Sequence, residues 1–174
     1  MIDLTTVKKI YFIGIKGVAM SGLAVICKDR GFKVSGSDVS DKFITDKILI
    51  NEGVEYFENF SKSNLDFNPD LVVIGTSWTD DNIEVAEAKK RGLQIISDSE
   101  MRGILSKEKR TVAVTGVHGK TTTTALASFL FTSAGVKPSF LIGTGMIPDL
   151  KTNARWTDGK HFIVEGDEYI GDHE

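Results

Sequence analysis

The fold is decided by the stretch Thr115-Gly116-Val117-His118-Gly119-Lys120-Thr121-Thr122, because it joins a strand pattern to a helical pattern. Residues 110–114, just before it, are rich in β-branched side chains and predict a short strand. Residues 123–131, just after it, carry apolar side chains at helical spacing. A strand, a glycine turn and a helix in this order are the context in which backbone N–H groups and a helix N-terminus bind phosphate.

The residues of this stretch have distinct expected roles in nucleotide binding. The glycines let the backbone turn sharply and point its N–H groups inward. Lys120 would reach the β- and γ-phosphates as the catalytic cation, and the Thr121 hydroxyl would ligate Mg2+. The predicted ATP-binding residues are Gly116, Val117, His118, Gly119, Lys120, Thr121 and Thr122.

The match to the common phosphate loop is incomplete. That pattern begins with a glycine four residues before Gly-Lys, a position that Val114 occupies in this chain. Gly116 lies closer to Gly119 than the pattern requires. The alternative is an ordinary strand-to-helix turn that happens to contain Gly and Lys. Because Gly-Lys-Thr-Thr falls at the predicted helix start, nucleotide binding is the favoured interpretation.

A second strand–turn–helix unit begins the chain. A strand pattern at 9–13 leads into Gly14-Ile15-Lys16-Gly17-Val18-Ala19-Met20-Ser21-Gly22, and a helical pattern continues to Gly31. A strand pattern at 32–35 then leads to Ser37 and Asp38. This βαβ order with an acidic residue after the second strand is typical of dinucleotide-binding folds. Lys16 and Ala19 replace two of the expected glycines, so an NAD site with Asp38 on a ribose is an alternative and weaker interpretation.

Polar residues follow two further strand patterns. The buried pattern at 71–74 ends in Gly75-Thr76-Ser77, and ligands of open α/β sheets bind beyond such strand ends. Thr76 and Ser77 could instead cap a helix that begins near residues 80–82. The strand pattern at 161–164 ends in the acidic run Glu165-Gly166-Asp167-Glu168-Tyr169. A carboxylate there could hold Mg2+ against the phosphates, whereas a solvated acidic loop is the alternative.

Taken together, these motifs resemble those of the Mur ligase family. The run Thr-Gly-x-His-Gly-Lys-Thr-Thr is similar to that family's ATP loop, and Gly-Ile-x-Gly-x-x-Met-Ser-Gly followed by Ser-Gly-Ser-Asp is similar to its UDP-binding motif. The acidic run at Glu165 resembles the family's Glu-Ala-Asp-Glu, with Gly166 in place of Ala. Lys16 replaces a family glycine, and a lysine beside a diphosphate is electrostatically reasonable.

The resemblance implies ligands and site residues. It implies ATP and Mg2+ as cofactors, with Thr121 and Glu165 as metal ligands. It implies UDP-N-acetylmuramate as one substrate and L-alanine or a short peptide as the other. It implies that the UDP-sugar is bound by residues that follow strands of the first unit: Gly14, Lys16, Gly17, Val18, Ala19, Met20, Ser37 and Asp38. Thr76 and Ser77 are further candidates for uridine or diphosphate contacts, because they also follow a strand end.

The predicted fold is α/β with parallel sheets: a Rossmann-like UDP-binding domain at 1–107, then the first part of a P-loop ATPase domain at 108–174. A helix is expected at 41–52 and irregular chain at 146–160. The resemblance implies that later parts of the ATP and amine sites lie beyond residue 174, so the chain alone is expected not to ligate. The incomplete sheet is expected to expose apolar edges at 112–114 and 162–164, which would favour self-association.

Composition excludes several other classes of protein. The chain has 174 residues, 41% hydrophobic content and a formal net charge of −3, without the basic run of a nucleic-acid binder. Cys27 is the only cysteine, which excludes a disulfide framework and a cysteine-based zinc cluster. No apolar run reaches membrane-spanning length and no secretory signal is recognisable, so the cytoplasm is the expected compartment. A non-catalytic UDP-sugar-binding module is the remaining alternative from another class.

Overall fold

The computed structural model describes residues 2–77 and 79–166, and its first sheet is entirely parallel. The strand order is β3-β2-β1-β4-β5. The order reverses between β1 and β4, which is where ligands bind in doubly wound sheets. The strands are β1 (Lys9–Ile13), β2 (Lys33–Ser37), β3 (Glu55–Phe57), β4 (Leu71–Ile74) and β5 (Gln94–Ser97).

The second sheet has the order β6-β9-β7-β8. β9 is parallel to both of its neighbours, and β8 is antiparallel to β7. The chain passes from the first sheet to the second through Glu108 and Lys109, between α4 and β6. The strands are β6 (Arg110–Val114), β7 (Ser139–Leu141), β8 (Ala154–Arg155) and β9 (His161–Glu165).

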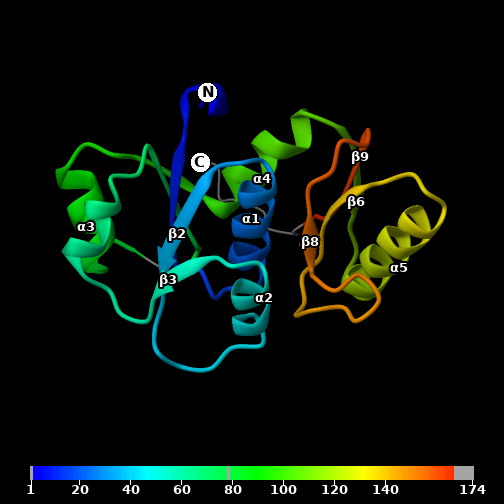
Figure 1. Ribbon diagram of the computed structural model, residues 1–174, viewed down its shortest axis with the longest axis horizontal. Helices are drawn as coiled ribbons and strands as arrows, with labels where there is room; N and C mark the ends of the chain where they lie inside the picture. Colours follow the sequence, from blue (N-terminus) through cyan, green and yellow to red (C-terminus); the bar gives the residue numbers. More distant parts are fainter. Residues whose placement is uncertain (1, 78, 167–174) are drawn as a thin grey trace.

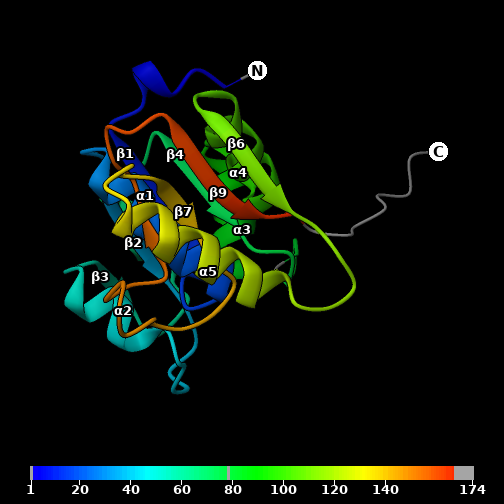
Figure 2. The ribbon, with the colours of Figure 1, turned by 90° about the vertical axis from the view of Figure 1, so that its right-hand side faces the viewer.

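The helices separate and cover the two sheets. Figure 1 shows α3 outside the first sheet, α1 between the sheets, and α5 outside the second sheet. Figure 2 shows α5 crossing one face of the second sheet. The helices are α1 (Val18–Asp29), α2 (Asp46–Asn51), α3 (Ile83–Lys90), α4 (Asp98–Lys107) and α5 (Lys120–Ser133), with short 3-10 turns η1 (Leu4–Thr6) and η2 (Lys62–Phe67).

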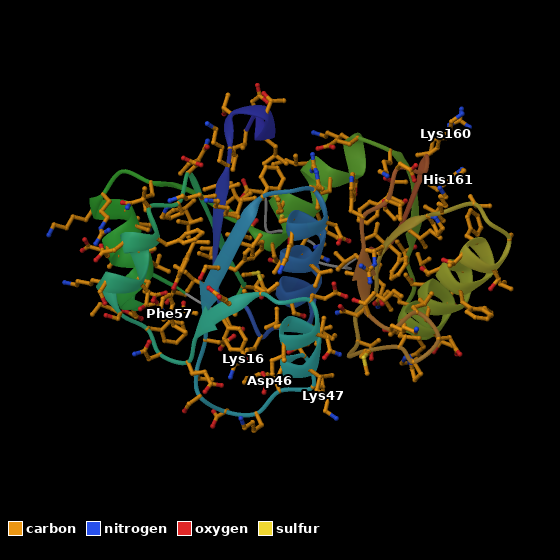
Figure 3. The ribbon with its side chains drawn as sticks, viewed as in Figure 1. Lys16, Asp46, Lys47, Phe57, Lys160 and His161 are labelled. Atoms are coloured by element: carbon orange, nitrogen blue, oxygen red, sulfur yellow. The ribbon has the colours of Figure 1, made fainter. Side chains whose placement is uncertain are left out.

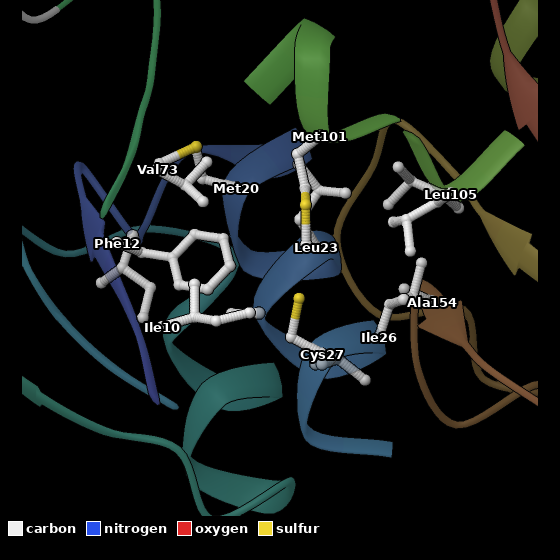
Figure 4. Packing of buried hydrophobic residues seen from close by; sticks show 14 of the residues in the cluster. Ile10, Phe12, Met20, Leu23, Ile26, Cys27, Val73, Met101, Leu105 and Ala154 are labelled. Carbon is white, nitrogen blue, oxygen red and sulfur yellow. The ribbon is translucent and has the colours of Figure 1, made fainter. Parts of the chain in front are cut away.

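The main core lies around α1 and includes side chains of both sheets (Figure 4). Successive residues of β1 alternate between the two faces of the first sheet: Ile10 and Phe12 contact the α1 side, and Tyr11 and Ile13 face α3. Phe162 of β9 belongs to the same cluster as the α1 side chains. Because both sheets bury apolar area against one helix, the two units share a continuous core.

Several sequence-based expectations are wrong in detail. The helix expected at 41–52 is confined to Asp46–Asn51, and the irregular stretch 146–160 contains β8. Residues 162–164 are not an exposed edge, because β9 pairs with β6 on one side and β7 on the other. Of the two expected apolar edges, the one at 112–114 is present, because β6 lies at one edge of the sheet, opposite β8, and Val112 is exposed.

Gly22 allows α1 to approach the second sheet closely. A Cβ at Gly22 would overlap the Leu141 side chain and lie 3.2 Å from Cβ of Ala154. We therefore expect Gly22→Ala to lower the free energy of unfolding by about 1–3 kcal/mol through overpacking. The matched control is Gly103→Ala in α4, where a Cβ meets nothing within 4 Å, so the free energy of unfolding should rise by about 0.5–1 kcal/mol. Urea denaturation measures both, and equal effects of the two variants would contradict the prediction.

Within residues 2–77 and 79–166, none of the helices combines the length and the apolar character that crossing a lipid bilayer requires.

Candidate functional site

The turn after β1 is held in place by β2. Gly14 has φ +85°, a value that favours glycine. Its N–H and the N–H of Ile15 both donate to the carbonyl oxygen of Ser37, at 2.8 and 3.0 Å. Gly17 is the N-cap of α1 and has no side chain that could cap the first-turn N–H groups. The N–H groups of residues 14–17 are thus used within the protein, and the N–H groups of the first turn of α1 are the ones placed to meet an anion.

A cavity of about 330 Å³ opens at the carboxyl ends of the first-sheet strands. Parts of its lining follow β1, β2, β4 and β5, as the switch-point rule predicts. Asn82, rather than Thr76 or Ser77, caps α3 by accepting from the N–H groups of Glu84 and Val85. The lining residues are Gly14, Gly17, Val18, Ala19, Met20, Asp38, Val39, Phe43, Gly75, Thr76, Ser77 and Asp98.

Two of the residues predicted to bind the UDP-sugar do not line this cavity. The ammonium of Lys16 is fully buried and donates to the carbonyl oxygens of Val39 and Asp41 and to the carboxylate of Glu58. The hydroxyl of Ser37 points to the α3 side of the sheet, where it donates to Glu84. The contributions of Lys16 and Ser37 to the turn are made through their backbone atoms, and neither side chain is placed to contact a diphosphate there.

Glu84 is a fully buried carboxylate at the centre of a polar network. It accepts from Asn64 Nδ2 at 2.8 Å, from the N–H of Ser61 at 3.0 Å and from the Tyr11 hydroxyl at 3.3 Å, in addition to Ser37. Burial raises the pKa of Glu84, and the hydrogen bonds it accepts limit that rise. The network fixes the end of β2, and with it the Ser37 carbonyl that holds the turn.

The fold itself does not require a glycine at position 17. A Cβ there would lie 3.4 Å from the Gly14 carbonyl oxygen and 3.5 and 3.7 Å from Cγ and Cβ of Met20, which are ordinary contacts. Its φ of −55° and ψ of 145° suit any residue. Since neither packing nor backbone conformation demands glycine, the missing side chain leaves room for a ligand in the cavity.

A second cavity, of about 360 Å³, continues from the first toward the second sheet. The two cavities share Ala19, Thr76 and Asp98 in their linings, and the second extends to Gly143 and Glu165. Arg102 also lines it and donates to the Asp98 carboxylate at 3.1 Å. The sequence analysis does not single out Asp98 as a site residue, because its place between the two cavities depends on how the two sheets pack together.

The predicted phosphate loop connects β6 to α5. Gly116 and Gly119 have φ values of +143° and +77°, so both positions need glycine. Lys120 is the first residue of α5, and its ammonium donates to the Gly116 carbonyl oxygen at 2.6 Å. The outer part of the loop is open to solvent, with Val117 76% exposed and His118 also exposed.

Glu165 lies at the end of β9, next to the start of α5. Its Oε2 accepts from the Thr121 hydroxyl at 3.2 Å, and its Oε1 accepts from the N–H of Gly143 at 2.6 Å. A Cβ at Gly143 would lie 2.7 Å from Glu165 Oε2, so a side chain at this position would displace the Glu165 carboxylate. The structure thus brings together the two residues predicted to ligate metal, which are 44 positions apart in the sequence.

The residues at this point suit Mg2+. A hydroxyl and a carboxylate are oxygen donors of the kind that Mg2+ prefers, and Mg2+ commonly completes its shell with phosphate oxygens and water. Among the described residues, no group of three His, Cys, Asp or Glu side chains could hold a metal by itself. Asp167, Glu168 and Tyr169 of the acidic run lie outside the described residues.

Comparison with known proteins gives consistent matches. A model described as the Mur ligase family, catalytic domain, matches residues 9–110. The UDP-N-acetylmuramate–L-alanine ligase of Dictyoglomus turgidum is 40% identical over 164 residues, which cover 94% of this chain and 35% of that protein. The chain spans about a third of the length of the curated relatives it matches.

Solved structures of two enzymes are similar to this one. The UDP-N-acetylmuramate:L-alanyl-γ-D-glutamyl-meso-diaminopimelate ligase of Neisseria meningitidis superposes with a TM-score of 0.83 at 33% identity, covering 93% of this chain and 53% of that one. The UDP-N-acetylmuramate–alanine ligase of Thermotoga maritima superposes with a TM-score of 0.80 at 29% identity, covering 91% and 37%. The similarity extends over both sheets.

Proposed function

Because the chain belongs to the Mur ligase family, we propose that it supplies two parts of a cytoplasmic ATP-dependent ligase that joins L-alanine to UDP-N-acetylmuramate. Residues 1–107 would bind the UDP-sugar, and residues 108–174 would begin the ATP-binding domain. The main support is the pair of cavities that share Asp98 and extend from the glycine turn at Gly14–Gly17 to Glu165 beside Thr121. A sugar diphosphate bound at the turn could therefore extend toward a phosphate loop on the second sheet.

The proposed chemistry has two steps. An oxygen of the muramate carboxylate attacks the γ-phosphorus of ATP, the bond to the leaving ADP breaks, and an acyl phosphate forms. The amine nitrogen of the amino acid then attacks the acyl carbon, loses a proton and expels phosphate, so that an amide remains. Lys120 would neutralise negative charge on the transferred phosphoryl group. Mg2+, held by Thr121 and Glu165, would supply further charge neutralisation when bound.

Two alternatives differ in what they leave unexplained. An NAD-binding oxidoreductase would use the cavity beside Asp38, but it gives no role to Lys120 or to the Thr121–Glu165 pair. A tripeptide-adding ligase shares every feature described for this site, and the Neisseria enzyme with that name is structurally similar. L-Alanine is preferred because the curated relatives at 38–40% identity carry the name of the L-alanine ligase.

Separate titrations of the 174-residue chain with UDP-N-acetylmuramate, NAD and ATP test the proposal. Isothermal calorimetry should detect UDP-N-acetylmuramate binding and no NAD binding. ATP should bind weakly, because the phosphate loop is exposed and neither cavity extends over it. Binding of NAD without binding of UDP-N-acetylmuramate would refute the proposal in favour of the oxidoreductase. L-Alanine and the tripeptide are then compared as substrates in a ligase of full family length that contains this segment.

The metal role of Glu165 leads to a prediction in the same full-length enzyme. Glu165→Gln keeps the shape of the side chain and removes its charge, so the Mg2+ concentration at half-maximal rate should rise about tenfold or more. Asp158→Asn is the matched control, because Asp158 is an exposed carboxylate that lines neither cavity. Measurement of initial rate against Mg2+ concentration distinguishes them, and an unchanged Mg2+ requirement in Glu165→Gln would exclude Glu165 as a ligand.

A further inference from the structure

The chain between β2 and α2, residues 38–45, forms one wall of the first-sheet cavity through Asp38, Val39 and Phe43. This segment has no helix or strand of its own. It must therefore be held in shape by contacts with other parts of the chain if it is to form a preformed binding surface.

Lys16 supplies several of those contacts, and the N–H of Asp38 adds another by donating to the Phe57 carbonyl oxygen. The Lys16 ammonium donates to the carbonyl oxygens of Val39 and Asp41 at 2.9 and 3.0 Å and to Glu58 Oε1 at 2.8 Å, which uses all three of its N–H donors. Asp46 Oδ1 lies 3.7 Å from the same nitrogen, and Figure 3 shows Lys16 and Asp46 close together beside α2. One side chain thus joins the turn after β1 to the segment after β2 and to the residue after β3.

The surroundings of the ammonium indicate a permanent structural cation. The residue has no exposed surface, and the rings of Tyr56 and Phe43 lie 5.4 and 5.7 Å from the nitrogen. Burial by itself lowers the pKa of Lys16, but the hydrogen bond from Lys16 to Glu58 and the charge of Asp46 outweigh burial and raise it. These neighbours therefore favour the charged form of the Lys16 side chain.

The backbone of Lys16 is part of the same arrangement. Its N–H donates to Asp38 Oδ2 at 2.7 Å, and its carbonyl oxygen accepts from the Thr45 hydroxyl. The turn itself depends on a different contact, since Gly14 and Ile15 donate to the Ser37 carbonyl. The side chain of Lys16 thus holds the wall of the cavity, whereas β2 holds the turn.

We propose that Lys16 is a positioning residue that shapes the Asp38–Phe43 wall for the nucleoside part of a uridine diphosphate ligand and does not contact the diphosphate itself. This inference rests on the proposed UDP-sugar function. It assigns the nucleoside to the wall and the diphosphate to the turn, so loss of the ammonium should weaken binding of the nucleoside selectively.

The test uses the 174-residue chain and two ligands, UDP and inorganic pyrophosphate. Lys16→Met keeps the length of the side chain and leaves the Val39 and Asp41 carbonyl oxygens without their donor. Its Kd for UDP should rise about tenfold, while its Kd for pyrophosphate changes less than about twofold. A global loss of structure would lower the affinity for both ligands in parallel and would overturn the inference. Unchanged binding of UDP would overturn it as well.

Glu58→Gln provides a second variant that is less demanding for folding. Glu58 is half-exposed, does not line the cavity and interacts with the wall through Lys16. As a single change, Glu58→Gln should raise the Kd for UDP by about threefold. Added to Lys16→Met, it should not raise the Kd further, because both changes remove the same interaction. Additive effects would overturn the inference. Failure of the unmodified chain to bind any uridine nucleotide would instead refute the proposed function, which keeps the two failures distinct.

Discussion

Replacement of Lys120 by Ala should lower the ligation rate by about a thousandfold in a ligase of full family length that contains this segment. Lys120 is the first residue of α5, and two glycines with positive φ angles shape the loop before it. The substitution would remove the main cationic side chain that faces the negative charge on the transferred phosphoryl group at this helix N-terminus. The Kd for UDP-N-acetylmuramate should change little, because we propose that this ligand binds in the first-sheet cavity.

Lys47→Ala is the matched control for this experiment. Lys47 is an exposed lysine of α2, and its removal changes the net charge by the same amount without affecting either cavity (Figure 3). Single-turnover kinetics separate the phosphoryl-transfer step from substrate binding. Turnover of Lys120→Ala at the rate of Lys47→Ala would mean that Lys120 has no catalytic role.

The sequence predicted the two strand–turn–helix units well because their signals are local. A run of β-branched residues, a glycine turn and an amphipathic helix are specified over about twenty residues each. Both units are present, with β1 leading to α1 and β6 leading to α5. The parallel pairing of β1 with β2 and β4 follows from the βαβ order.

The sequence was misleading where a distant residue competes with local propensity. Residues 41–52 have a helical pattern, but the Asp41 carbonyl oxygen, which a helix would use for its own hydrogen bond, accepts from Lys16 instead. The helix consequently begins only at Asp46. Such a long-range contact, across 25 positions, leaves no periodic signal in the sequence.

The face of α5 that contacts the sheet is a second example. Leu126, Phe129 and Leu130 have helical spacing, yet they are 56%, 40% and 54% exposed, whereas Thr124 and Ser128 are fully buried. The two hydroxyls can be buried because they donate to the carbonyl oxygens of Lys120 and Thr124 within the helix. Short side chains on this face let α5 lie close to β9 and so bring Thr121 to Glu165.

The candidate site was predictable only where its residues are specified by local sequence. Most residues taken from the glycine turn line the cavity because they occupy a strand end. Val39, Phe43 and Asp98 were missed because their place depends on how separate loops are folded together. Pattern alone could not indicate that the side chains of Lys16 and Ser37 point away, since that depends on the position of Glu58 and Glu84.

The second large effect is expected from Gly17→Val in the 174-residue chain, which should weaken UDP-N-acetylmuramate binding by more than about a hundredfold. A Cβ at Gly17 finds ordinary contacts at 3.4 and 3.5 Å, so the variant should fold and keep its thermal unfolding midpoint. Its branched side chain would occupy the space beside the first-turn N–H groups of α1, where we propose that the diphosphate binds.

Gly17→Ala makes the result quantitative, because a single methyl group should produce a smaller loss of affinity than the valine side chain. Calorimetry gives the Kd of each variant, and circular dichroism confirms that the fold is retained. An ordered loss of affinity from Gly to Ala to Val at constant stability is the signature of steric exclusion at the turn. A folded Gly17→Val variant with parental affinity would mean that the diphosphate binds elsewhere, because the valine side chain and the ligand would need the same space.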